Sequence, residues 1–313
     1  MTEALRPMST GQVLDHTFSL YRRNFLLFVG IASIGPALYL IFQLLMVGSA
    51  AAPVGSRRAA TAGLSFGFGI IAGIIVMLAG MAIAHAATVK AVAAVYLGRQ
   101  ISIAGAYRAL SGRVWRVLGV FLMVMLISGL AAGVIILVAV IIGTVAVVGG
   151  AKAGTAGTVL GIIVGFGAAV VGGLVAIAIY IRYSLAVQAC VVEDLGIIAS
   201  LKRSAVLSKG SRSRILTVYF VFGVLSYIVA FGLGALAAGA GAVLRNPILA
   251  AILIYVATFV AGALNGPLAT IGISLLYYDE RVRKEAFDLQ LMMSSLDASG
   301  FPGSSPTPAP AQI

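Results

Sequence analysis

Two ionisable side chains, His85 and Lys90, lie in a long apolar stretch of the sequence and are its first candidates for chemistry. Ionisable groups inside a membrane are costly and often functional, so a polar pathway is one interpretation of both residues. The sequence favours a structural interpretation of each. Lys90 lies near the end of the stretch, where its ammonium group can reach the headgroup layer. His85 lies deeper, and we expect a neutral imidazole hydrogen-bonded to a neighbouring helix.

Two uncharged polar residues in apolar stretches, Gln43 and Asn265, are candidates for lining a pore or pocket. Hydrogen bonding between helices, typically worth about 0.6 kcal/mol, is the favoured interpretation. No Asp or Glu lies inside a predicted membrane span, which counts against a carboxylate relay for protons or sodium. Glycine pairs four residues apart predict close packing of helices, and they occur at residues 69 and 73, 129 and 133, 161 and 165, and 262 and 266.

Sequence motifs of catalysis are missing from the chain. No glycine-rich loop precedes a Lys-Ser/Thr pair, and no H-E-x-x-H occurs. The single cysteine, Cys190, has no base partner near it in the sequence and cannot close an intrachain disulfide. We therefore predict that the chain is not an enzyme and has no catalytic residue, cofactor or metal site.

The composition excludes a soluble globular protein. Of the 313 residues, 61% are hydrophobic and 10% are charged, and the mean hydropathy is +1.11. Soluble domains are nearer half apolar and a quarter charged. About 20 apolar residues of helix cross a bilayer, and six stretches qualify: 25–47, 64–88, 117–148, 159–181, 215–238 and 248–276. We predict an all-α, polytopic membrane bundle over residues 1–296, with a disordered Pro/Ser/Ala-rich tail at 297–313.

The charges predict how these spans are oriented. With six spans, 17 of the 21 Lys and Arg residues lie on one side, and the remaining 4 are Arg57, Arg58, Lys152 and Arg245. All 9 Asp and Glu residues lie on the side of the 17. The positive-inside rule then places that side, with both chain termini, in the cytoplasm. The net charge of +12 is explained by orientation and by attraction to anionic headgroups, so we expect no binding to nucleic acid.

A threefold repeat is predicted from regular spacing. Segments with helical periodicity begin at residues 9, 102 and 196, each before an odd-numbered span. Apolar residues recur at helical spacing in the second and third of them, at Ile103, Tyr107, Leu110 and Val114 and at Ile197, Leu201 and Ala205. We expect short amphipathic helices lying in the headgroup layer. The unit is then an interfacial helix plus two spans, repeated over about 9–95, 102–190 and 196–290.

Three motifs resemble a known family. They are STGQVLD at 9–15 continuing into LYRRNF at 20–25, VED at 192–194 with SLKRS at 200–204, and LLYYDERVRKEAFD at 275–288. Together they are similar to the membrane domain found beside glycerophosphoryl diester phosphodiesterases and in free-standing bacterial membrane proteins. The resemblance implies a multi-pass protein of the bacterial inner membrane. It implies no phosphodiesterase activity, because the chain has no room for the separate catalytic barrel and its only histidines are His16 and His85.

Two sets of charged residues are the candidate functional groups. One set is expected to form a structural layer of salt bridges between the interfacial helices and the span ends: Asp15, Glu193, Asp279, Arg281 and Arg283. The other set is expected to form a surface for lipid headgroups or a partner: Arg22, Arg23, Arg108, Arg113, Arg116, Arg203, Arg212 and Arg214.

The leading functional hypothesis is a non-enzymatic membrane protein that engages anionic lipid, or an unidentified partner protein, at the cytoplasmic leaflet. It rests on the basic amphipathic segments and on the missing catalytic motifs. The alternative is a permease or channel for a lipid-like or small solute, because internal repeats and interrupted spans are typical of transporters. The Asn265-Gly266-Pro267 sequence in the last span is the interruption on which that alternative depends.

Overall fold

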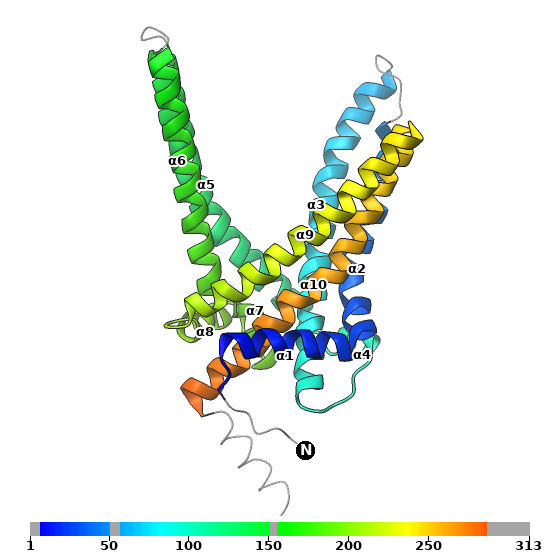
Figure 1. Ribbon diagram of the computed structural model, residues 1–313, viewed down its shortest axis with the longest axis vertical. Coiled ribbons are helices and arrows are strands. Elements are labelled where there is room, and N and C mark those ends of the chain that lie inside the picture. Colours follow the sequence, from blue (N-terminus) through cyan, green and yellow to red (C-terminus); the bar gives the residue numbers. More distant parts are fainter. Residues whose placement is uncertain (1–6, 51–56, 151–154, 287–313) are drawn as a thin grey trace, which may run out of the picture.

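The computed structural model describes residues 7–50, 57–150 and 155–286, and every regular element in these ranges is a helix (Figure 1). The six long helices are α2 (Phe25–Ala50), α3 (Arg57–Tyr96), α5 (Val114–Gly150), α6 (Thr155–Tyr183), α9 (Arg212–Leu244) and α10 (Pro247–Glu285). The four short helices are α1 (Thr10–Arg23), α4 (Ile103–Arg108), α7 (Ala186–Val192) and α8 (Ile197–Leu207). The predicted tail at 297–313 lies outside the described residues.

All six long helices are long and apolar enough to cross a membrane, which confirms the predicted spans. Their outward surfaces are apolar: on α5 and α6, Leu130 is 65% exposed and Phe166 is 72% exposed. Such a surface is stable in lipid and not in water. The chain therefore folds as a polytopic helical membrane protein. The last span is continuous, because α10 passes through the Asn265-Gly266-Pro267 sequence without ending.

The short helices gather at one end of the bundle (Figure 1). This end, called here the short-helix end, also holds the starts of α2, α5 and α9 and the finishes of α3 and α10. The opposite end holds the turn from α9 to α10. The α5–α6 hairpin diverges from the other four long helices toward that opposite end, while α9 and α10 run side by side (Figure 1).

The core lies at the short-helix end. Its buried residues come mainly from the last turns of α3, from α7 and from the last part of α10, including Val92, Val191 and Tyr277. This packing explains why α3 continues to Tyr96, beyond the predicted span end at residue 88. The extra turns bury Val89, Ala91 and Val92 against the neighbouring helices. The short-helix end is thus a packed scaffold on which charged side chains can be fixed.

Each short helix that precedes a span packs against more than one long helix: α1 mainly against α10, α4 against α2 and α3, and α8 against α5 and α6. Two of these contacts are alike. A Cβ added to Gly30 would lie 2.4 Å from Cδ1 of Ile103, and one added to Gly119 would lie 2.4 Å from Cδ1 of Ile197. At both positions the tip of the isoleucine side chain occupies the space that a β-carbon would fill, so a larger residue would require that tip to shift.

The buried faces of α4 and α8 differ from the predicted apolar series. Helix α4 ends at Arg108, so Leu110 and Val114 lie beyond it. On α8 the buried residues are Ser200, Leu201, Ser204 and Leu207, whereas Ile198 and Val206 are exposed. Serines are tolerated there because their hydroxyls donate to main-chain carbonyls, those of Gly196 and Arg182, at 2.8 and 3.0 Å. Apolar periodicity alone cannot identify a face of this kind.

A close approach of two long helices joins α2 and α3 at Gly35 and Gly80. A Cβ added to Gly80 would lie 3.2 Å from Cα of Gly35. Two of the predicted glycine pairs also lie in close contacts, since Gly73 faces Phe42 and Gly262 faces Pro36. The pair at 129 and 133 does not, because a Cβ at either position would meet no atom within 4 Å. That part of the packing prediction was wrong.

Substituting Gly80→Val should force α2 and α3 apart, because the added side chain meets main-chain atoms that cannot move aside. Overpacking of this kind typically costs about 1–3 kcal/mol of unfolding free energy. Gly129→Val is the matched control, since it makes the same change in helix propensity where space is open. Reversible unfolding in bicelles measures both variants. Equal loss of stability in the two would contradict the close α2–α3 contact.

Candidate functional site

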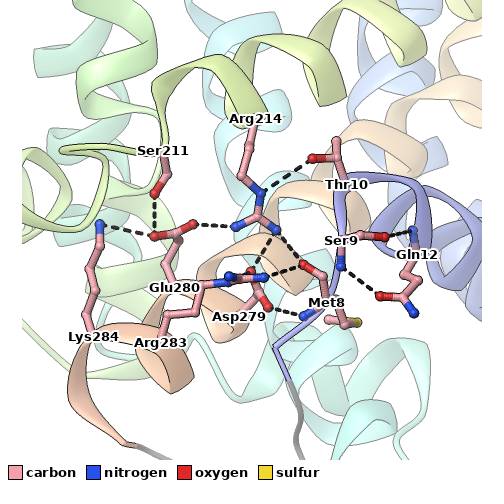
Figure 2. Close-up of polar contacts among 10 residues, drawn as sticks. All are labelled: Met8, Ser9, Thr10, Gln12, Ser211, Arg214, Asp279, Glu280, Arg283 and Lys284. Atoms are coloured by element: carbon pink, nitrogen blue, oxygen red, sulfur yellow. Dashed lines mark hydrogen bonds and ion pairs between the residues drawn. The ribbon is translucent and has the colours of Figure 1, made fainter.

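Two adjacent carboxylates near the end of α10, Asp279 and Glu280, are almost completely buried, with 2% and 1% of each residue exposed. One guanidinium bridges them (Figure 2). Arg214, in the first turn of α9, places Nη2 at 2.8 Å from Asp279 Oδ2 and Nη1 at 2.8 Å from Glu280 Oε1. Buried charges require such pairing, because an unpaired carboxylate in this position would lose its hydration without compensation.

Further donors complete this first cluster. Ser211 Oγ donates to Glu280 Oε2 at 2.5 Å, and Lys284 Nζ lies 3.1 Å from the same oxygen. Arg283 Nε donates to Asp279 Oδ2 at 2.9 Å. Both carboxylates therefore accept from several groups at once, and the start of α9 is joined firmly to the end of α10.

The first cluster also holds the segment before α1 (Figure 2). The Met8 N–H donates to Asp279 Oδ1 at 2.6 Å, and the Met8 carbonyl accepts from Arg214 at 2.8 Å and Arg283 at 2.7 Å. Helix α1 begins directly afterwards with a capping box, in which Ser9 and Gln12 each accept from the other's main-chain N–H. The position of α1 is thus set by α9 and α10.

A second cluster joins α7, α8 and α10 around Arg203. Its Nε donates to Glu193 Oε2 at 2.9 Å, and Nη1 and Nη2 lie 2.5 and 2.7 Å from the two oxygens of Glu285. The hydrogen bond with Glu285 raises the pKa of Arg203. Tyr277 donates to Glu193, and Arg281 Nε lies 3.3 Å from Glu285. The bidentate geometry makes this a specific connection between α8 and α10.

A third, exposed cluster joins Asp194 to the beginning of α5. Arg113 Nη2 lies 2.8 Å from one carboxylate oxygen of Asp194, and Arg116 Nη1 lies 3.0 Å from the other. The side chains in these pairs are 36–45% exposed. Pairs this open to solvent contribute at most about 1 kcal/mol to stability. This cluster positions the loop after α7 and adds little to the strength of the fold.

The structure separates the two predicted sets of charges. Of the predicted salt-bridge layer, Glu193, Asp279, Arg281 and Arg283 lie in the first two clusters. Asp15 does not, because it is exposed on α1 and forms no ion pair within the described part of the chain. Of the predicted basic surface, half is paired with carboxylates: Arg113, Arg116, Arg203 and Arg214.

The other half of the basic surface is exposed, and its members form no ion pair with any described residue: Arg22, Arg23, Arg108 and Arg212. Arg22 and Arg23 end α1, Arg108 ends α4, and Arg212 begins α9. All four guanidinium groups therefore lie at the short-helix end, where they can bind anions. The paired arginines hold the fold instead.

Several residues of the clusters are absent from the predicted sets, among them Met8, Ser211, Tyr277 and Lys284. One sequence signal was available, because Asp279 and Arg283, and likewise Glu280 and Lys284, are four residues apart on a helix. Met8 gave no signal, since it takes part through main-chain atoms. The Ser211 hydroxyl also carries no pattern that points to a carboxylate 69 residues away.

The polar residues inside the bundle differ in whether their side chains form hydrogen bonds between helices. His85 forms the predicted hydrogen bond between helices, with its Nδ1 at 3.0 Å from Thr270 Oγ1 of α10. Asn265 Nδ2 has no partner among the described residues, so the hydrogen bond predicted for this residue is not made by its amide nitrogen. Gln188 is completely buried in α7, and its side-chain amide likewise has no described partner. Sequence reasoning did not identify Gln188.

Comparisons of the chain with models of known families, with curated proteins and with solved structures find no match. The family resemblance of the three sequence motifs therefore stays a prediction.

Substituting Arg214→Gln should strongly destabilise the protein, because Asp279 and Glu280 would stay buried with their bridging cation removed. Breaking a buried ion pair costs about 3–5 kcal/mol. The control is Arg116→Gln, which removes an exposed pair worth at most about 1 kcal/mol. Denaturant unfolding in mixed micelles measures the difference. Similar stabilities of the two variants would show that the first cluster does not hold α9 to α10.

Proposed function

We propose that this chain is a non-enzymatic protein of the bacterial inner membrane that binds anionic lipid headgroups through its short-helix end. Its membership of the family with the phosphodiesterase-associated membrane domain is part of this proposal. In it, the short-helix end faces the cytoplasm, and α1, α4 and α8 lie in the headgroup layer of the inner leaflet.

The unpaired arginines carry the proposal. Arg23, Arg108 and Arg212 are exposed and form no ion pair with described residues. Of the described carboxylates at this end, Asp15 alone forms no ion pair, and the other five do: Glu193, Asp194, Asp279, Glu280 and Glu285. The surface therefore has an excess of positive charge that its own acids cannot cancel. Basic residues near an anionic membrane surface contribute about 1 kcal/mol each to attraction.

The orientation is supported by the positive-inside rule. The four short helices lie at the same end as the unpaired arginines, and this end carries most of the basic residues of the sequence (Figure 1). The described chain also begins and finishes at that end, at Pro7 and Ala286. This agrees with an even number of crossings.

The threefold repeat is a further part of the proposal. Its support is the order of elements, in which α1, α4 and α8 each precede a long helix. The equivalent contacts of Ile103 with Gly30 and of Ile197 with Gly119 also support it. In such an arrangement, each unit presents its basic short helix to the same leaflet, so three weak headgroup contacts act together.

Lipid retention tests the proposed function. The full-length protein is placed in nanodiscs that contain equal amounts of phosphatidylcholine and phosphatidylglycerol, and the lipids that stay bound after extraction are measured by native mass spectrometry. We expect enrichment of phosphatidylglycerol that weakens as salt concentration rises. The triple substitution Arg23→Gln, Arg108→Gln and Arg212→Gln should remove most of that enrichment.

Arg245→Gln is the control for this experiment. Arg245 is an exposed arginine at the opposite end of the bundle, where α9 turns into α10. Removing it changes the net charge without touching the short-helix end, so phosphatidylglycerol should stay enriched. Equal retention of the two lipids by the unaltered protein would overturn the proposed function. A loss of enrichment in Arg245→Gln as large as that in the triple substitution would also overturn it.

A further inference from the structure

A hollow of about 540 Å³ lies on α1 where this helix meets α2. It is lined by Asp15, Phe18, Ser19, Tyr21, Arg22 and Phe25. Phe25 is the first residue of the first membrane span, and α1 lies across the end of the bundle (Figure 1). The hollow is therefore placed at the depth where apolar chains give way to headgroups.

The hollow contains one carboxylate and one guanidinium that do not neutralise each other. Asp15 and Arg22 are both exposed, and neither forms an ion pair with a described residue. They are seven residues apart on one helix, which places their Cα atoms about 10 Å apart along its axis and on the same side. Opposite charges presented on one side of the helix are complementary in sign to a headgroup that carries a cation and an anion.

Aromatic side chains give the hollow a fixed apolar border. Tyr21 donates to the Leu264 carbonyl of α10 at 2.8 Å, and its ring lies edge-on to Phe25 with 5.3 Å between centroids. Phe18 packs against Phe222 of α9 with 5.6 Å between centroids. Phe18 and Phe25 stay 42% and 40% exposed. Aromatic rings of this kind suit the glycerol and upper acyl region of a lipid.

We propose that this hollow binds the headgroup of a phosphoethanolamine lipid. The Arg22 guanidinium binds the phosphate, and the Asp15 carboxylate accepts hydrogen bonds from the primary ammonium group. Choline lipids fit less well, because a trimethylammonium group has no N–H to donate. Phosphatidylglycerol also fits less well, because its headgroup brings no cation to Asp15.

This inference rests on the proposed function only in placing the short-helix end among lipid headgroups. The two sites differ in charge. The anionic-lipid surface uses Arg23, Arg108 and Arg212, whereas the hollow uses Asp15 together with Arg22. A zwitterionic lipid is thus selected by Asp15 and Arg22. Neither of these side chains belongs to the set that attracts anionic lipid.

The test uses the full-length protein in nanodiscs with equal parts of phosphatidylethanolamine, phosphatidylcholine and phosphatidylglycerol. Native mass spectrometry measures the retained lipids. We expect phosphatidylethanolamine to be retained over phosphatidylcholine by roughly threefold to fivefold, as for one solvent-exposed ionic contact. Asp15→Asn should bring that ratio to about one, while Asp15→Glu should preserve it. Arg22→Gln should lower retention of both zwitterionic lipids.

Arg99→Gln is the control, because Arg99 is exposed at the short-helix end but belongs neither to the hollow nor to the anionic-lipid surface. It should leave the ethanolamine-to-choline ratio unchanged. A ratio of one in the unaltered protein, or a ratio that survives Asp15→Asn, would overturn this inference. Enrichment of phosphatidylglycerol is measured in the same spectra. The proposal of an anionic-lipid surface and the proposal of a phosphoethanolamine site can therefore be contradicted independently of each other. Circular dichroism of each variant shows that its helices remain folded.

Discussion

Arg214 bridges two adjacent buried carboxylates, Asp279 and Glu280, at the short-helix end of the bundle. Membrane helices gain little from the hydrophobic effect once they are in lipid, so packing and polar contacts must fix their arrangement. This ion-pair cluster joins the start of α9 to the end of α10 and holds the Met8 segment that positions α1. The Arg203 cluster does the same for α7, α8 and α10. The short-helix end depends on both.

The sequence predicted the spans and the side on which the charges gather, because an apolar run of about 20 residues and a biased distribution of Lys and Arg are strong signals. It did not predict which arginine meets which carboxylate. Arg214 and Glu280 are 66 residues apart, and only the packing of α9 on α10 brings them together. Nor did it predict the serine-lined face of α8, since hydroxyls that bond to nearby carbonyls can be buried like apolar groups.

The basic residues of the short-helix end have two roles that their sequence pattern does not distinguish. Arg214 holds the fold by pairing with buried acids and Arg203 by pairing with half-buried ones. Arg23, Arg108 and Arg212 are exposed without a described partner. Asp15 stands apart from the other described carboxylates because no described cation pairs with it. The proposed binding of lipid headgroups follows from this division. The exposed charged side chains that form no ion pair within the described part of the fold are available to bind headgroups at a membrane surface.

Cysteine labelling from each side of the membrane tests the central claim most directly. In a Cys190→Ala background, the exposed positions are Arg99→Cys and Lys209→Cys at the short-helix end and Arg245→Cys at the other. We predict that an impermeant maleimide added to inside-out vesicles labels the first two and not the third, and that spheroplasts give the reverse. Labelling of Arg99→Cys and Arg245→Cys from the same side would contradict the proposed orientation.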